Sequence, residues 1–273
     1  MTTCWRTELT RQRRQVLERL VLARLRLHLL CSTNFSQFQS AYRKGHCTEV
    51  LDSVYTTADN KQVTDLVGLD LSAAFDTVSH DTLLDRLQRE FGVTGTELSW
   101  IQSYLSDRSQ FVKLGHHQSP AVSLNVGVPQ GSVLGPLLFA VYCSPVFDMI
   151  AKHGVYSTIS MLTTRSSLSP CVLTTRVGLS VLVACTSDVK LWYIQTGLPL
   201  NPDKSEALIV GTSSQLKQVL PAVPSLTVTG LNLPVSEQMK VLGVILDRRL
   251  TFQKHATAVA KSCNYHAQAT RHV

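Results

Sequence analysis

The chain has 273 residues, which is enough for one large domain or two small ones. Hydrophobic residues make up 44% of the sequence and charged residues 16%, a composition that excludes intrinsic disorder and allows a sizeable core. The 26 Lys and Arg residues against 19 Asp and Glu residues give a net charge of +7. This balance favours polyanionic partners, nucleic acid first, although an ordinary basic protein can share it.

The seven cysteines are scattered and form no Cys-x-x-Cys pair. They predict reduced thiols, with neither a disulfide framework nor a structural zinc site. No apolar run approaches the roughly 20 residues that a membrane-spanning helix needs, and we recognise no signal peptide. We therefore expect an intracellular protein, nuclear or cytoplasmic, without a membrane partner.

The first predicted element is a basic helix over residues 10–30. Leu17, Leu20, Val21 and Leu25 recur at helical spacing and predict a single apolar face. Residues 31–48 form a polar, basic segment that we interpret as a loop, and a short helical pattern over 48–57 follows it.

The rest of the chain mixes helical and strand patterns. Apolar residues over 63–71 predict a buried strand. Further helices are predicted over 81–91, 94–105 (capped by Thr94 or Thr96), 137–150 (kinked or broken by Pro145) and 179–196. Further strands are predicted over 110–114 and 121–126, paired around 116–120, and over 207–210 and 240–246. This mixture indicates an α/β or α+β domain.

One local pattern carries chemistry. The predicted strand over 63–71 contains Asp70 near its end, and a tight bend follows that carries Phe75. A carboxylate held at a strand end is the rigid, hard oxygen ligand that Mg²⁺ prefers. A lone aspartate at such a place is more often a cap or a turn residue. The pattern at Asp70 therefore indicates a function only in combination with other motifs of the sequence.

Those neighbours match a known family. GLDLSAAFDTV (68–78) and GVPQGSVLGPLLF (127–139) resemble motifs A and B of reverse transcriptases from non-LTR retrotransposons of the LINE type, in particular the jockey and CR1-like groups. QSAYRKGH (39–46) is similar to the fingers segment before motif A, LNPDKSEALIVG (200–211) resembles motif D, and MKVLGVILDRRLTF (239–252) resembles the primer grip and its continuation. The resemblance runs from about Gln15 to the end of the chain.

The resemblance implies an α+β fold, the right-hand polymerase palm, in which helices back an antiparallel sheet. It places partial fingers over 1–62, the palm over 63–252 and the start of a thumb or connection over 253–273, so that little or no thumb is expected. The implied partners are an RNA template, a DNA primer and a deoxynucleoside triphosphate, and the implied cofactor is Mg²⁺.

Roles for single residues follow from the same resemblance. Asp70 is the expected metal ligand of motif A, and the carbonyl of Leu71 is a second oxygen near the metal. Lys204 is expected near the triphosphate, as a charge stabiliser or a proton donor. Phe75 takes the place of the steric gate, whose ring leaves no room for a 2′-hydroxyl.

The remaining expected site residues contact the nucleotide, the template or the primer. Gln130 and Gly131 are expected to line the nucleotide pocket. Arg43 and Lys44 are expected to meet phosphates, although a solvated basic loop explains them equally well. The expected primer-grip residues are Val241, Leu242 and Gly243.

The sequence departs from the family at motif C, where a Tyr-Ala-Asp-Asp is expected a few residues after Gly154. VYSTISMLTTR (155–165) stands there instead, and no Asp or Glu occurs between Asp148 and Asp188. Codons can be chosen for residues 159–176 such that the same bases, read in a shifted frame, encode QYADDTQLSLAMRADNT. Our hypothesis is a pair of compensating frameshifts over about 155–177, which the genomic sequence tests directly.

The expected metal site thus has one carboxylate in place of three. We expect an RNA-directed DNA polymerase by descent whose activity is lower by several orders of magnitude. Two alternatives remain open at this point. One is a nucleic-acid-binding remnant without chemistry, and the other is a translated fossil without a selected function.

Overall fold

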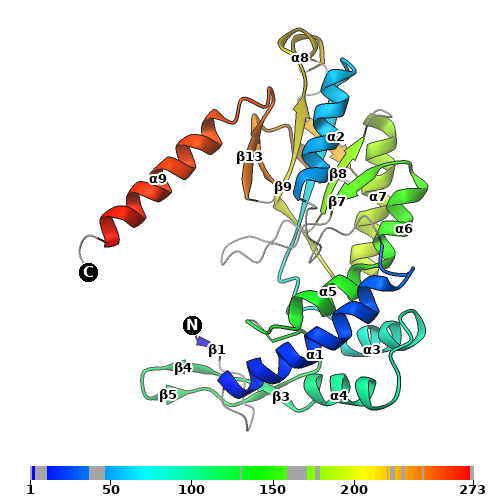
Figure 1. Ribbon diagram of the computed structural model, residues 1–273, viewed down its shortest axis with the longest axis vertical. Helices are drawn as coiled ribbons and strands as arrows, with labels where there is room; N and C mark the ends of the chain where they lie inside the picture. The colour runs from blue at the N-terminus through cyan, green and yellow to red at the C-terminus, as the bar shows by residue number, and fades with distance from the viewer. Residues whose placement is uncertain are drawn as a thin grey trace. The chain divides into compact units, whose positions relative to one another are not determined.

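The computed structural model describes residues 2–3, 11–36, 47–129, 131–158, 171–175, 179–219, 221, 225–228, 231–241 and 243–270 (Figure 1). The chain divides into two compact units. Unit 1 comprises Met1–Gln39, Ser72–Asp148 and Trp192–Pro199. Unit 2 comprises Ser40–Leu71, Met149–Leu191 and Leu200–Val273.

Unit 2 is built on an antiparallel sheet with the strand order β7-β8-β2-β9. Its strands are β7 (Tyr156–Thr158), β8 (Cys171–Thr175), β2 (Thr64–Leu71) and β9 (Leu200–Val210). Every residue of β2 except Asp65 is buried. The predicted buried strand is therefore confirmed, and it is an interior strand with a hydrogen-bonded neighbour on each side.

One core cluster of unit 2 joins the sheet to helix α2 (Cys47–Asp59) and to the hairpin of β12 (Gln238–Val241) and β13 (Val244–Asp247). Its buried members are Val54, Leu66, Leu208, Val210, Met239, Val241 and Leu246. The prediction of one continuous strand over 240–246 is wrong. Gly243, at φ +86°, reverses the chain there, a conformation that glycine adopts without steric cost.

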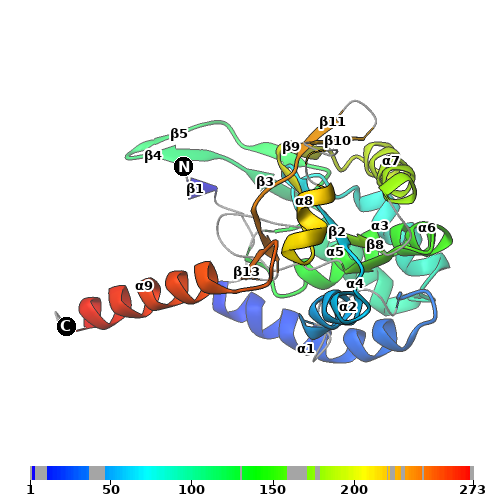
Figure 2. The ribbon, with the colours of Figure 1, turned by 90° about the horizontal axis from the view of Figure 1, so that it is seen from above.

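Further elements of unit 2 lie on the C-terminal side of β9. They are α8 (Ser213–Val219), the antiparallel pair β10 (Ser225–Val228) and β11 (Leu231–Pro234), and α9 (Gln253–Thr270). Strand β11 lies beside β9, as Figure 2 shows from above. Helix α9 has no buried residue.

Unit 1 is mainly helical and contains α1 (Arg11–Cys31), α3 (His80–Arg89), α4 (Gly95–Leu105) and α5 (Gly135–Cys143). The helix predicted over 137–150 is divided into α5 and α6 (Pro145–Lys152) by a break at Ser144, directly before Pro145, as expected. The predicted helix over 179–196 is present as α7 (Leu179–Gln195). Thr94 is the N-cap residue of α4, but its side chain makes no capping hydrogen bond.

The expected hairpin of unit 1 is divided into two short ladders. β3 (Arg108–Gln110) pairs with β6 (Val122–Leu124), whereas β4 (Val112–Leu114) pairs with β5 (His117–Gln118) and with β1 (Thr2–Thr3). The predicted pairing of 110–114 with 121–126 is therefore present only at Gln110, which pairs with Val122, whereas residues 112–114 pair with β5 and β1. At the interruption, the Ser119 hydroxyl accepts a hydrogen bond from the Val112 backbone N–H at 2.9 Å.

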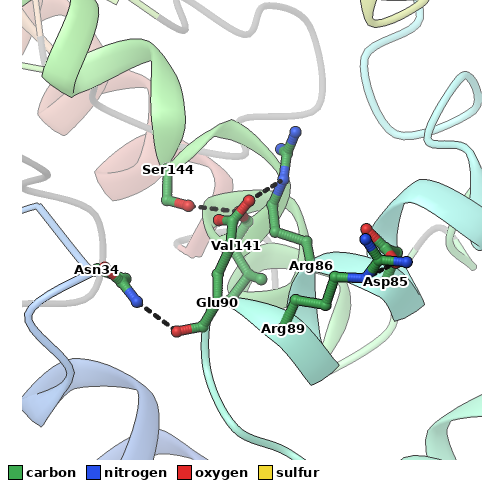
Figure 3. A network of polar contacts seen from close by, with 7 residues as sticks. All are labelled: Asn34, Asp85, Arg86, Arg89, Glu90, Val141 and Ser144. Carbon is green, nitrogen blue, oxygen red and sulfur yellow. Dashed lines mark hydrogen bonds and ion pairs between the residues drawn. The ribbon is translucent and has the colours of Figure 1, made fainter.

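Helix α3 is tied to its neighbours in unit 1 by polar contacts (Figure 3). The Arg86 guanidinium pairs with Glu90 (3.4 Å from Nε to Oε1) and lies over the ring of Tyr142. The Asn34 side chain donates a hydrogen bond to the Glu90 carbonyl, so the loop after α1 is joined to the end of α3. These contacts hold in place the helix that follows the Phe75 turn.

The single apolar face predicted for α1 is not what the structure has. Leu25 and Leu29 are buried, but Leu17 and Leu20 are 38% and 62% exposed. A helix at the surface of a protein buries one stripe of its side chains, and in α1 the buried stripe is the one that contains Leu25 and Leu29.

Candidate active site at the end of strand β2

Asp70 lies at the end of β2 in unit 2, and only 4% of its surface is exposed. Its backbone N–H donates to the Ser205 hydroxyl at 3.1 Å, and that hydroxyl donates to the Asn201 carbonyl at 2.7 Å. The carboxylate oxygen Oδ1 is buried and has no hydrogen-bond partner in the described part of the chain. A buried oxygen without a partner is costly, and such groups in native proteins commonly mark a ligand position.

A bulge in β9 shapes this site. The pairing of β2 with β9 runs from Thr64↔Val210 to Gly68↔Glu206 and resumes at Asp70↔Asn201. One residue of β2 and four residues of β9 (202–205) lie between the two ladders. Pro202 opens this segment, and proline has no N–H to give to a ladder. The bulge brings the Ser205 hydroxyl to the Asp70 backbone.

Burial raises the pKa of Asp70. The charge of Lys204, a side-chain hydrogen bond from Asn201 and the backbone N–H of Leu71 each lower it, but they only partly offset the burial. The structure therefore brings two residues predicted from the sequence, Asp70 and Lys204, into electrostatic contact. Lys204 is exposed on the bulge, where a phosphate could reach it.

Asn201 and Ser205 were not among the residues expected from the sequence. Both lie in the LNPDKSE segment, but the reasoning there concerned Lys204 alone. Pro202, shortly before the strand predicted over 207–210, was the available signal, because a proline beside a strand favours a bulge in which side chains can reach the neighbouring strand.

The turn that carries Phe75 belongs to unit 1 and is joined to the segment before α5. Backbone N–H groups of Val128 and Gly127 donate to the carbonyls of Phe75 (2.8 Å) and Val78 (2.7 Å). The half-buried Phe75 ring lies 5.2 Å from the ring of Phe139, measured between centroids. The turns of the two motifs named A and B above therefore form one hydrogen-bonded structure.

Gly131 is exposed at φ +75°, and the expected site residue Gln130 lies outside the described residues. Immediately after them, the start of α5 is held by a buried carboxylate from α1. Glu18 accepts hydrogen bonds from the Ser132 hydroxyl (2.9 Å) and from the backbone N–H of Val133 (2.5 Å). Sequence reasoning missed this role for Glu18, because nothing local to 10–30 links it to a turn more than a hundred residues later.

Two of the expected primer-grip residues, Val241 and Gly243, lie where β12 ends and before β13 begins. The Val241 side chain is 3% exposed and belongs to the core cluster of unit 2, so its side chain supports the hairpin from within. Gly243 is exposed at the turn, and Leu242 lies outside the described residues. Arg43 and Lys44 also lie outside them.

The residues at Asp70 fit a single carboxylate contact to a cation, since Oδ1 is buried and has no partner among the residues that the structure describes. They do not fit a two-metal site. Within the described part of the chain, no three or more His, Cys, Asp or Glu side chains are grouped so that they could hold a metal ion. The sequence, moreover, has no Asp or Glu from 149 to 187.

A family model described as reverse transcriptase (RNA-dependent DNA polymerase) matches residues 2–246. Among curated relatives from Drosophila melanogaster, the probable RNA-directed DNA polymerase from transposon BS is 29% identical over 93% of this chain and 28% of its own length. The RNA-directed DNA polymerase from the mobile element jockey is 26% identical over 91% of this chain and 27% of its own length. The chain thus spans little more than a quarter of these relatives.

Solved structures of telomerase from Candida tropicalis resemble the fold. An apo form truncated at its C-terminal domain has a TM-score of 0.52 at 16% identity, over 90% of this chain and 45% of that one. A further apo form has a TM-score of 0.54 at 13% identity, over 89% and 40% of the two chains. The expected α+β polymerase palm is confirmed. Among the described helices, none has the length and apolar character to span a membrane.

Proposed function

The chain belongs to the reverse transcriptase family, of the LINE type found in non-LTR retrotransposons, and on that premise we propose that it is the palm of an RNA-directed DNA polymerase that has lost nucleotidyl transfer. One observation carries the loss. Asp70 is the motif A carboxylate, and the chain offers no Asp or Glu from 149 to 187, where the family resemblance requires two.

Nucleotidyl transfer in this kind of site depends on two divalent ions, which carboxylates would hold and which would stabilise the attacking and the leaving oxygens. In this chain Asp70 can supply one carboxylate contact to Mg²⁺. Each loss of about 1.4 kcal/mol of transition-state stabilisation lowers the rate tenfold. We therefore expect polymerase activity lower by about four orders of magnitude or more.

Binding without chemistry is the part of the function that the remaining residues support. Lys204 is exposed beside Asp70 and presents its charge to a phosphate. Phe75 is proposed as the steric gate, Gln130 and Gly131 as the nucleotide-pocket lining, and Arg43 and Lys44 as phosphate contacts. Val241, Leu242 and Gly243 are proposed as the primer grip. A net charge of +7 favours an RNA template and a DNA primer.

Primer extension tests the loss of chemistry. Residues 159–176 are replaced by QYADDTQLSLAMRADNT, the product of the shifted frame. The matched control carries QYANNTQLSLAMRADNT, which has the same length and differs only in the two carboxylates. Each protein is assayed with an RNA template, an annealed DNA primer, deoxynucleoside triphosphates and Mg²⁺. We expect extension only by the Asp-Asp replacement, and we expect Asp70→Asn to abolish it.

Magnesium-dependent extension by the unaltered chain, abolished by Asp70→Asn, would show that another group completes the site. Extension by none of the proteins would give the chemistry proposal no support, and a binding measurement then separates the two alternatives. Affinity for the primer–template that falls steeply between 50 and 200 mM salt, as phosphate contacts require, supports a binding remnant. An aggregating, protease-sensitive chain supports a translated fossil.

A further inference from the structure

Helix α1 exposes a second apolar stripe, on a side other than the one it buries. Val16, Leu20 and Leu27 are 59%, 62% and 71% exposed, and Ala23 between them is exposed as well. The half-buried Leu30 continues the series. This stripe covers most of the helix length, whereas the buried stripe contains Leu25 and Leu29. We call the residues Val16, Leu20, Ala23, Leu27 and Leu30 the α1 seam.

The spacing within the α1 seam alternates between four and three residues. An average of 3.5 residues is the repeat that keeps a narrow stripe facing a second helix along its length. The seam has no Trp or Phe, and Leu17 is the one large exposed hydrophobic residue of α1 beside it, whereas interfacial membrane helices present a broad apolar face with aromatic residues. The pattern therefore favours a partner helix over a lipid surface.

The charges beside the seam determine what kind of helix fits. Arg19 and Arg26 flank it on one side and Arg24 on the other, at the positions that face the partner's own flanks in a helix pair. Glu18 is the one acidic residue of α1, and it is buried. A second copy of α1 would set arginines against arginines, so an acidic partner is favoured.

A cavity adjoins the seam on the Arg24 side. Its volume is about 520 Å³, and its apolar lining includes Val21 and Leu25 from α1 and Trp100 and Ile101 from α4. All of these residues belong to unit 1. A concave apolar site beside a flat stripe is where a large anchoring side chain of a partner contributes most to affinity.

We propose that the α1 seam and this adjoining cavity form a docking surface for an amphipathic helix whose apolar positions are flanked by Asp and Glu. The seam provides the apolar contact, the arginines select acidic flanks, and the cavity receives one large side chain. This surface is separate from the residues proposed for polymerase function and does not depend on that function.

Two synthetic helices test the proposal against the 273-residue chain by fluorescence anisotropy. Both peptides have Leu at the positions that would face the α1 seam and one Trp beside them. The first peptide has Glu at the flanking positions, and the second has Lys there. We expect the Glu peptide to bind at least tenfold more tightly than the Lys peptide at low salt. Arg19→Glu combined with Arg24→Glu should reverse that preference, because it reverses the charge that faces the flanks.

Single substitutions locate the contact. Leu20→Ser and Leu27→Ser should each weaken binding of the Glu peptide roughly tenfold, which is the size of effect expected for a buried interface anchor. Leu191→Ser is the matched control, since Leu191 is a 54% exposed leucine on α7, and it should leave binding unchanged. Trp100→Ala should weaken binding if the cavity receives the peptide's Trp. All four positions are tested with a circular dichroism melt to check that the fold is intact.

Three outcomes would overturn the proposal. Equal binding of both peptides, or binding indifferent to Leu20→Ser and Leu27→Ser, removes the seam as the site. Sedimentation of the chain with vesicles of phosphatidylserine and phosphatidylcholine, lost in Leu27→Ser and without any peptide binding, would make the surface a lipid contact. A concentration-dependent dimer abolished by Leu27→Ser would make the occupant a second copy.

Discussion

Two neighbouring segments of this chain differ in whether their polar groups have hydrogen-bond partners. The first follows Phe75 in unit 1, where the backbone groups of Phe75 and Val78 are bonded to the segment before α5. The second contains Asp70 at the end of β2 in unit 2, where a buried carboxylate oxygen has no partner among the described residues. Asp70 and Phe75 are five positions apart, yet the Phe75 carbonyl has its hydrogen-bond partner and Asp70 Oδ1 has none among the described residues.

The comparison separates residues that stabilise the fold from a residue that is kept for binding a ligand. Glu18 accepts hydrogen bonds from the Ser132 turn, and Gly127 donates one to the Val78 carbonyl, so that replacing either residue should lower stability. Asp70 is held in place by Ser205 while its charge is opposed by burial, so that its removal should raise stability. Residues kept for a ligand commonly cost stability in the absence of that ligand.

The largest effect is expected at Glu18. Glu18→Ala removes the acceptor of the Ser132 hydroxyl and the Val133 N–H and leaves a void around them. Because buried donors left without a partner are costly and the lost bonds are charge-assisted, we expect a loss of about 3 kcal/mol in the free energy of unfolding. Urea denaturation followed by circular dichroism measures it.

Glu18→Gln keeps one oxygen acceptor and should recover about half of that loss. Arg19→Ala, at the exposed next position on α1, serves as the control and should change stability by less than about 0.5 kcal/mol. A Glu18→Ala protein as stable as the Arg19→Ala protein would show that the start of α5 needs no support from α1.

An intermediate effect is expected at Gly127, which has φ +88°. A Cβ atom there would lie 2.9 Å from the Asp76 carbonyl oxygen, which is closer than such atoms approach. Gly92, at φ +65°, has open space around the same position. Gly92→Ala should cost about 1 kcal/mol for its backbone conformation alone.

Gly127→Ala should cost about 2–3 kcal/mol, because the clash is added to that conformational term. The difference between the two variants, measured by urea denaturation, isolates the contact between the two motif turns. Equal losses would mean that the Asp76 carbonyl moves away freely and that the two turns are not held together.

Much of this arrangement could be read from the sequence. The apolar run over 63–71 predicted a buried strand with a carboxylate near its end, and Pro145 predicted the break between α5 and α6. Both follow from local rules, the pattern of burial along a strand and the missing N–H of proline. The family resemblance singled out Lys204 as well, whose charge lowers the pKa of Asp70, while its role at a triphosphate stays a prediction.

The parts that could not be predicted depend on contacts between distant segments. Glu18 looks like any helix-surface acid until the loop before α5 is placed against it. The Ser205–Asp70 bond arises from a bulge whose size the sequence does not state. The apolar pattern of α1 indicated a helix correctly but could not tell which of two leucine-containing stripes would be buried.

The smallest effect, and the one of opposite sign, is expected at Asp70. Burial raises the pKa of this carboxyl, so the folded state holds its proton more tightly than the unfolded state does. Below the usual aspartate pKa of about 3.9 both states are protonated, and burial of the side chain costs no charge. As the pH rises through 3.9 and then through the raised folded value, the wild type loses stability.

Asp70→Asn carries no charge to bury, so it should be more stable than the wild type at pH 7 by about 1 kcal/mol, or about 2–4 °C in Tm. The difference should shrink toward zero below about pH 4. Asp59→Asn, which removes an exposed carboxylate on α2, is the control for the change in net charge. A variant less stable than the wild type at pH 7 would mean that Lys204 and Asn201 outweigh burial, and that Asp70 is held for structure like Glu18.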